Sequence, residues 1–123
     1  MGLPMNPSSP LPNWITQLRK GFFDLCILNC LNTEEYYGYD LVQRLKAFDG
    51  ATMREGIIYP ILARMQEDGL VTSERRPSTA GPPRKYYQIT PEGRRALAEM
   101  NAYWKQMTAV MDSISSPPEA RHE

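Results

Sequence analysis

The sequence predicts a mainly helical domain that carries one small β-hairpin. Apolar residues recur at helical spacing in four separate segments of the chain. Two short β-prone runs, 70–74 and 85–90, flank a tip rich in Pro, Ser, Thr and Gly. The resulting order is three helices, two strands and a final helix. This order is the layout of a winged helix-turn-helix with an N-terminal helix and a C-terminal helix.

The composition favours one domain and argues against an enzyme. The 123 residues are enough for one modest core, and the formal net charge is zero. The only histidine is His122, in a polar terminal stretch. Because most catalytic triads and many metal sites use histidine, we expect no catalytic residues and no metal site. No glycine-rich phosphate loop is visible either, so we expect no cofactor.

The sequence also predicts where the protein works. It shows neither a secretory signal nor the ~18–20 apolar residues that a membrane span needs. Cys26 and Cys30 lie four residues apart in an apolar segment, where a bridge along one helix would be strained. We therefore expect a reduced, cytoplasmic protein without a membrane partner. Two inert core thiols are the favoured reading of the cysteines, and a redox switch is the alternative.

Residues 1–13 are predicted to be a flexible tail because prolines interrupt them. A first helix should cover about 14–31, with an apolar face that includes Leu18 and Phe22. The stretch NTEEYYG is expected to be a loop. A second helix should cover about 38–48, and its buried stripe is Leu41, Val42, Leu45 and Phe48.

The third helix is predicted over about 53–68. Thr52 and Glu55 fit a capping box at its start, and Gly69 suits its end. Pro60 is unusual inside a helix because proline removes a hydrogen bond. A later start, near Glu55 or Gly56, would place Pro60 closer to the first turn, where the missing donor costs less.

The last helix is predicted over 91–114, after a winged helix-turn-helix domain at 14–90 and before a flexible tail at 115–123. Thr90 is its expected cap, and Pro91 occupies its first position. Its apolar residues repeat every three or four positions, which is a heptad seam. One small domain cannot bury so long a seam, so we expect pairing with a second copy. The seam residues are Leu97, Met100, Trp104, Met107, Met111 and Ile114.

Five segments resemble the PadR-like transcriptional regulators, in particular the short, multidrug-sensing subclass with a single C-terminal helix. They are LRKGFFDLCIL, YGYDL, REGIIYPILARMQEDGLV, GPPRKYYQIT and TPEGRRAL. They follow one another in order between residues 18 and 114. The resemblance implies a homodimeric repressor that binds a pseudo-palindromic DNA operator and responds to a small molecule.

Two regions carry the expected contacts with double-stranded DNA. Between Arg75 and Arg95 lie six basic residues and one acid, a local charge of +5 (6 − 1). Small residues on the third helix would allow close approach to a groove. The resemblance adds a tyrosine pair near the DNA backbone, of which one ring is expected to pack in the core. The candidate residues are Tyr37, Tyr39, Thr52, Arg54, Glu55, Gly56, Tyr59, Arg84 and Lys85.

The resemblance also implies a ligand site at the dimer interface. In the multidrug-sensing members, a tryptophan that matches Trp104 lines a flat pore able to hold a planar aromatic effector. Simple packing of Trp104 in the interface is the alternative. The candidate residues of this combined ligand and dimer surface are Leu18, Phe22, Leu97, Met100, Trp104, Met107 and Met111.

A winged helix that binds proteins instead of DNA is the competing interpretation of the whole chain. The zero net charge fits this alternative. The local basic window favours DNA, because phosphate contacts need cationic side chains.

Overall fold

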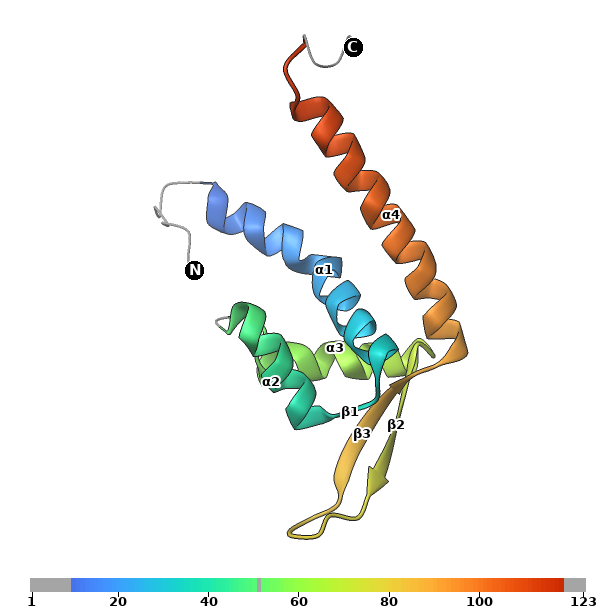
Figure 1. Ribbon diagram of the computed structural model, residues 1–123. Coiled ribbons are helices and arrows are strands. Elements are labelled where there is room, and N and C mark those ends of the chain that lie inside the picture. The colour runs from blue at the N-terminus through green and yellow to red at the C-terminus, as the bar shows by residue number, and fades with distance from the viewer. Residues whose placement is uncertain (1–9, 51, 119–123) are drawn as a thin grey trace.

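The computed structural model describes residues 10–50 and 52–118, and it confirms the predicted fold class. The described residues form four helices and a small antiparallel sheet, whose hairpin protrudes from the helical body (Figure 1). The hairpin β2–β3 and the long helix α4 leave the helical body in opposite directions (Figure 1). In chain order the elements are α1 (Leu11–Thr33), β1 (Tyr36–Tyr37), α2 (Gly38–Asp49), α3 (Glu55–Glu67), β2 (Val71–Arg76), β3 (Arg84–Ile89) and α4 (Pro91–Ser115).

The core lies where α1, α2 and α3 meet the base of the sheet. Apolar side chains at helical spacing turn inward from each helix, as the sequence pattern predicts. Phe48 is the exception on α2, because its side chain is 71% exposed. The most deeply buried side chains are Ile27, Leu28, Leu41, Val42, Leu45, Ile58, Leu62, Met65, Val71 and Leu97.

The sheet has the order β1–β3–β2, and each neighbouring pair is antiparallel. Strand β3 pairs with β2 from Val71↔Ile89 to Arg76↔Arg84, and with β1 through Tyr36↔Tyr87 and Tyr37↔Tyr86. The prediction of a loop at β1 was wrong. A two-residue strand carries no periodic signal of its own, and only its pairing with the distant β3 makes it a strand.

Helix α1 begins at Leu11, so residues 11–13, predicted as tail, are helical. Proline is tolerated in a first turn because the missing N–H would be unpaired there anyway. The helix is kinked at Lys20 and Gly21, where Gly21 has a φ of 79°. Glycine adopts this conformation without a steric penalty. Residues 1–9 and 119–123 of the two predicted tails lie outside the described residues.

Helix α3 starts at Glu55, which agrees with the later of the two predicted starts. The predicted capping box is wrong, because Arg54 occupies the cap position and makes no side-chain cap bond. The segment before it is a tight turn in which the amides of Thr52 and Met53 donate to the carbonyl of Asp49. The turn places the hydroxyl of Thr52 in the interior, without a hydrogen-bond partner among the described residues.

Helix α4 is fixed to the body at its first turn. Thr90 Oγ1 accepts a hydrogen bond from the amide of Gly93 at 2.9 Å and donates to the carbonyl of Gly69 at 2.6 Å. A Cβ atom on Gly93 would lie 2.1 Å from the carbonyl oxygen of Leu70, so only glycine fits there. Further along, the side-chain amides of Asn29 and Asn101 exchange hydrogen bonds of 3.1 and 3.0 Å between α1 and α4.

None of the helices described is both long enough and apolar enough to span a membrane.

Candidate nucleic-acid interface and the apolar face of α4

The outer face of α3 is lined by small side chains. Gly56, Pro60 and Ala63 are all exposed, and they lie opposite the buried stripe of Ile58, Leu62 and Met65. A Cβ atom on Gly56 would meet nothing within 4 Å. This glycine is therefore not needed for packing within the chain. Because it has no side chain, nothing protrudes from α3 at this position, near the end that carries Arg54.

The charged residues at the start of α3 differ in whether they form an ion pair. Arg54 is exposed and, within the described part of the chain, forms no ion pair. Glu55 Oε1 lies 3.1 Å from Lys46 Nζ on α2. A backbone hydrogen bond and this lysine lower the pKa of Glu55, so its carboxylate is ionised and engaged. The prediction of Thr52 as a DNA contact was wrong, because its hydroxyl is buried and cannot reach DNA in this conformation.

Tyr59 lies at the junction of α3 with the start of α2 and with β3. A Cβ atom on Gly38 would be 3.1 Å from the ring and from the hydroxyl of Tyr59, and 3.2 Å from the ring of Tyr87. Gly38 therefore leaves room for the Tyr59 ring to pack closely against the start of α2. The Tyr59 side chain remains 37% exposed, and partial burial raises the pKa of its phenol.

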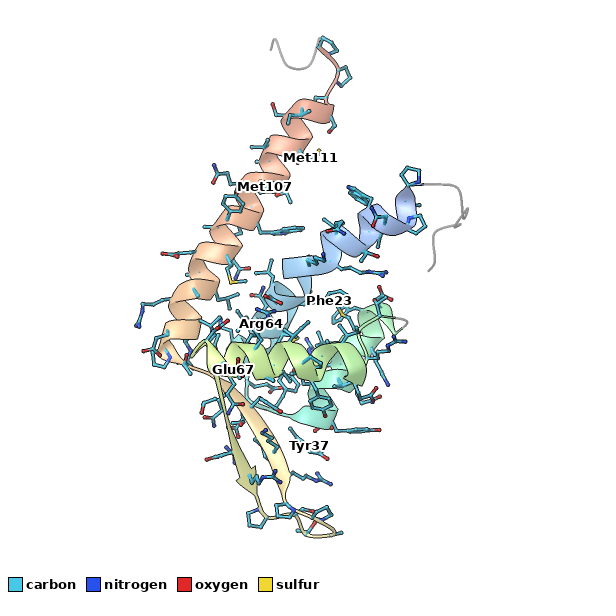
Figure 2. The ribbon with its side chains drawn as sticks, turned by 180° about the vertical axis from the view of Figure 1, so that it is seen from behind. Phe23, Tyr37, Arg64, Glu67, Met107 and Met111 are labelled. Carbon is cyan, nitrogen blue, oxygen red and sulfur yellow. The ribbon has the colours of Figure 1, made fainter. Side chains whose placement is uncertain are left out.

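The two tyrosines before and after Gly38 both lie at the surface. The prediction that one of them packs in the core was wrong, since Tyr37 is half-buried and Tyr39 is 53% exposed. Their ring centroids are 6.2 Å apart. Tyr37, labelled in Figure 2, lies beside the hairpin, with its ring centroid 5.8 Å from that of Tyr86.

Three basic residues of the hairpin lie over tyrosine rings. The guanidinium of Arg84 lies 4.8 Å from the centroid of Tyr37, and that of Arg76 lies 4.5 Å from the centroid of Tyr86. Lys85 Nζ lies 5.6 Å from the centroid of the buried Tyr87. Because successive strand residues alternate in direction, Arg84 and Lys85 point to opposite faces of the hairpin. Both side chains are exposed.

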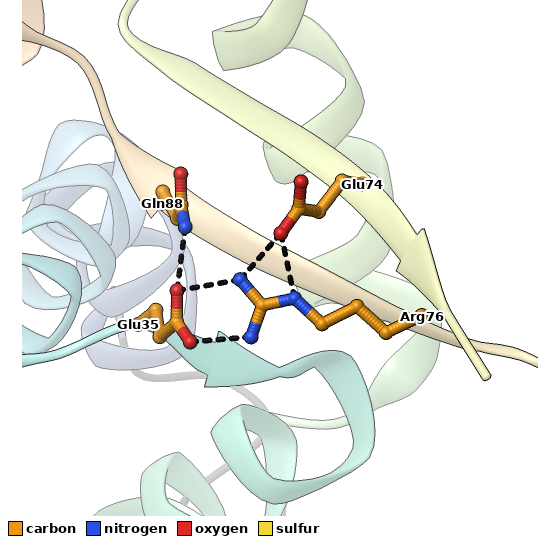
Figure 3. A network of polar contacts seen from close by, with 4 residues as sticks. All are labelled: Glu35, Glu74, Arg76 and Gln88. Carbon is orange, nitrogen blue, oxygen red and sulfur yellow. Dashed lines mark hydrogen bonds and ion pairs between the residues drawn. The ribbon is translucent and has the colours of Figure 1, made fainter. Parts of the chain in front are cut away.

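A polar network that no sequence pattern predicts joins the end of α1 to both long strands (Figure 3). Arg76 Nη2 donates to Glu35 Oε2 at 2.8 Å, and its Nε donates to Glu74 Oε1 at 2.6 Å. Gln88 also donates to Glu35. Hydrogen bonds from Arg76 first, and then from Gln88, lower the pKa of Glu35 to about 2. Arg76 is therefore neutralised, and it contributes little to the basic window.

The outer half of α4 exposes an apolar face. Trp104 is 42% exposed, Met107 46% and Met111 58%. Both methionines are labelled in Figure 2, on the part of α4 that extends beyond the body. Tyr103, Val110 and Ile114 are exposed as well. The prediction of Leu97 as an interface residue was wrong, because its side chain is only 2% exposed and packs in the chain's own core.

Helices α1 and α4 border an open cavity of about 680 Å³. The rings of Phe22 and Trp104 lie 5.5 Å apart at this cavity. Five of the seven residues predicted for the interface line it, and Leu97 and Met111 do not. The five are Leu18, Phe22, Met100, Trp104 and Met107.

Cys26 and Cys30 are free and half-buried, without a disulfide. Burial raises the pKa of both thiols. At Cys30, a hydrogen bond with Arg44 opposes that effect. Raised pKa values favour the protonated, unreactive thiol, which fits the interpretation of inert residues at the edge of the core.

Comparison with protein families gives a match over the same elements. The sequence model described as the transcriptional regulator PadR-like family matches residues 27–99, from the middle of α1 into α4. A transcriptional regulator of Mycobacterium tuberculosis is 40% identical over 75 residues, which cover 61% of this chain and 68% of that protein.

Solved structures give a similar result. A PadR-like transcription factor from Bacteroides fragilis has a TM-score of 0.69 and 39% identity, covering 84% of this chain and 99% of its own. A PadR-like transcriptional regulator from Bacillus cereus has a TM-score of 0.74 and 36% identity, covering 82% of this chain and 98% of its own. The likeness therefore includes α4 as well as the winged body.

Proposed function

Because the chain belongs to the PadR-like transcriptional regulator family, we propose that it is a homodimeric, sequence-specific DNA-binding repressor. The observation that carries this proposal is the exposed strip of Gly56, Pro60 and Ala63 on α3, set beside the cationic hairpin. A regulator of transcription works where the DNA is, so the predicted cytoplasmic location is part of the proposal.

In the proposed complex, α3 enters the major groove and the hairpin contacts the flanking backbone. The absence of a side chain at Gly56 allows α3 to approach the floor of the groove closely. Arg54 and the hydroxyl of Tyr59 lie toward the end of the helix that reaches base edges or phosphates. Arg84 and Lys85 bind phosphates from opposite faces of the hairpin. The hydroxyls of Tyr37 and Tyr39 supply further phosphate donors, and the Tyr37 ring holds Arg84 in place.

Dimerisation is proposed through the apolar face of α4. In Figure 1 the first half of α1 and the outer half of α4 diverge, and both carry exposed apolar residues. The α4 helix of a second copy would cover Trp104 and Met107 of the first copy. By symmetry, the first copy would cover the same two residues of the second. An exposed seam of this length on an isolated chain would otherwise favour aggregation.

A planar aromatic effector is proposed to bind where Phe22 and Trp104 border the open cavity. Binding there would change the separation of the two α3 helices and release DNA. The chain has two tryptophans, so in a Trp14→Phe background Trp104 is the only indole. Quenching of its fluorescence then reports on this cavity alone.

Selection from a random duplex pool tests the DNA part of the proposal. Purified protein should enrich a motif with two inverted half-sites about one helical turn apart. A Gly56→Trp variant, which fills the strip on α3 without touching the core, should enrich nothing.

Failure of the native protein to enrich any motif, with a dimer present in solution, would instead favour a winged helix that binds other proteins. That alternative would explain the neutral overall charge and the ion pairing of Arg76.

A further inference from the structure

A second cavity, of about 410 Å³, shares Lys20 and Gly21 with the one at Trp104 but is otherwise lined by different residues, including several of α3 and none of α4. It lies between the kink of α1 at Lys20 and Gly21 and the first turns of α3. Phe23 and Arg64, both labelled in Figure 2, mark the place where α1 passes α3. We propose that this cavity binds an organic anion with an apolar body, such as a medium-chain carboxylate. Its volume is within the range of about 300–1,000 Å³ that is common for ligand pockets.

The charge around the cavity favours an anion. Four basic side chains line it, whereas Asp24 is the only acid among the lining residues. Two of the four are already paired, Arg19 with Asp49 at 3.4 Å and Arg64 with Asp24 at 2.8 Å. Within the described residues the other two, Lys20 and Arg54, have no carboxylate partner. Two unpaired cations therefore face one cavity.

The lining of the cavity favours an apolar body on that anion. Phe23, Ile57 and Ile61 line it together with the basic residues, and its lining surface is mostly apolar. A hydrated inorganic anion would leave this surface without a partner, whereas an aliphatic chain would cover it. The combination of apolar and cationic lining residues therefore selects amphiphilic anions over simple ones.

Thr52 supplies a second, independent observation at the same place. It lines the cavity, and its buried hydroxyl has no hydrogen-bond partner within the described residues. Buried polar groups without partners are rare in folded proteins. Rotation of χ1 exchanges the hydroxyl with the methyl group of the same side chain, so the hydroxyl can donate to a carboxylate in the cavity.

The position of the cavity connects it to the DNA-facing surface. Arg54 lines the cavity and is also the cap residue of α3, the helix proposed to enter the groove. A carboxylate held by Arg54 would compete with a DNA phosphate for the same guanidinium. Bound anion should therefore lower the affinity for DNA, and by reciprocity DNA should lower the affinity for the anion. This coupling rests on the proposed function, whereas the binding site does not.

Calorimetric titration of the full chain with decanoate tests the site. We expect one site per chain, binding at least tenfold weaker for the neutral 1-decanol, and a tenfold or greater loss in the double variant Lys20→Gln, Arg54→Gln. Both substituted side chains are exposed, so circular dichroism should show an unchanged fold. Thr16→Trp, which narrows the cavity from its exposed wall, should also abolish binding.

Trp104→Ala separates this cavity from the one at α4, and decanoate binding should survive that substitution. Loss of binding in Trp104→Ala with retention in the double variant would overturn the proposal, as would equal affinity for 1-decanol. Absence of any binding heat at millimolar decanoate would overturn it too. These titrations contain no DNA, so failure of the proposed function leaves their result unaffected. In a separate titration, decanoate that leaves DNA affinity unchanged would overturn the link through Arg54.

Discussion

Glu35 joins three segments of the chain through its side chain. It follows α1, and its carboxylate accepts hydrogen bonds from Arg76 on β2 and Gln88 on β3 (Figure 3). Both strands of the hairpin are thereby tied to the helical body, β2 through its last residue Arg76 and β3 through Gln88 near the base. A hairpin fixed through both strands can hold Arg84 and Lys85 at a defined distance from α3.

The pKa of Glu35, lowered to about 2, gives the first prediction. A carboxylate whose pKa is lowered by folding stabilises the folded state above its unfolded pKa of roughly 4.3, and this contribution is lost as pH falls toward 2. Glu35→Gln should therefore lower the melting temperature at pH 7. The difference from the native protein should shrink steadily between pH 5 and pH 2.5. A difference that is independent of pH would contradict the ionic role of Glu35.

Gly93 gives a second prediction. A Cβ atom there would overlap the carbonyl of Leu70, which is backbone and cannot turn aside. Gly93→Ala should destabilise the fold by about 1–3 kcal/mol, the usual cost of overpacking. Urea unfolding measures this loss. The same change at the neighbouring exposed site, Glu92→Ala, is the control and should cost less than about 0.5 kcal/mol.

Gly56 should respond in the opposite way. It lies in the first turn of α3, and nothing is near its missing side chain. Gly56→Ala should raise stability by about 0.4–1 kcal/mol, because it restricts the unfolded chain. If α3 enters the groove as proposed, the added methyl group should weaken DNA binding by about tenfold, or ~1.4 kcal/mol. A stabilised variant with native DNA affinity would exclude Gly56 from the interface.

At the scale of single residues, sequence patterns predicted burial well and polar partners poorly. Leu41, Leu45, Ile58 and Leu62 follow from helical spacing alone. The pair of Asn29 with Asn101 joins residues 72 positions apart, and no local pattern contains that information. Thr52 shows the same limit, since its sequence fits a capping box but the turn before α3 directs its hydroxyl inward.

At the scale of elements, the long helices could be predicted because each carries a periodic apolar face. The last helix was placed within one residue of α4, since Thr90 and Pro91 mark its start chemically. Strand β1 and the kink of α1 could not be predicted in this way. The first exists only through pairing with β3, and the second depends on the φ of a single glycine, Gly21.

Helix α4 shows how an element's pattern can mix two roles. Leu97 continues the seam by spacing but lies in the chain's core, because Gly93 draws the first turns of α4 against the body. The later seam residues, from Trp104 to Ile114, remain largely exposed within the described chain. Spacing alone cannot distinguish the part of an apolar stripe that is buried within its own chain from the part that stays exposed for a partner chain.

At the scale of the whole molecule, the proposed dimer can be tested by one matched pair of substitutions. Burial of one methionine contributes roughly 1.5–3 kcal/mol, and a symmetric contact counts it twice. Met107→Glu should therefore weaken self-association by a hundredfold or more in sedimentation equilibrium. Ala109→Glu places the same charge on the opposite face of α4 and should leave the dimer intact. Equal behaviour of the two variants would exclude this face as the interface.

The whole molecule has zero net charge, so its affinity for DNA must come from local cations rather than from its overall field. Arg76 and Arg95 are engaged by carboxylates, Arg76 by Glu35 and Glu74, and Arg95 by Glu92 at 3.5 Å. Arg75, Arg84 and Lys85 are the hairpin cations without a carboxylate partner among the described residues. Of these, we expect Arg84 and Lys85 at the start of β3 to dominate the contacts with phosphates.

The salt dependence of DNA binding, measured by fluorescence anisotropy, tests this central claim most directly. Each phosphate contact contributes about 0.9 to the slope of log affinity against log salt. The variant Arg84→Ala, Lys85→Ala removes four cations per dimer and should reduce the slope by about 3 to 4. The variant Arg94→Ala, Arg95→Ala removes the same charge from the base of α4 and should change the slope little. Equal slopes for native protein and hairpin variant would contradict the proposal that the hairpin binds DNA.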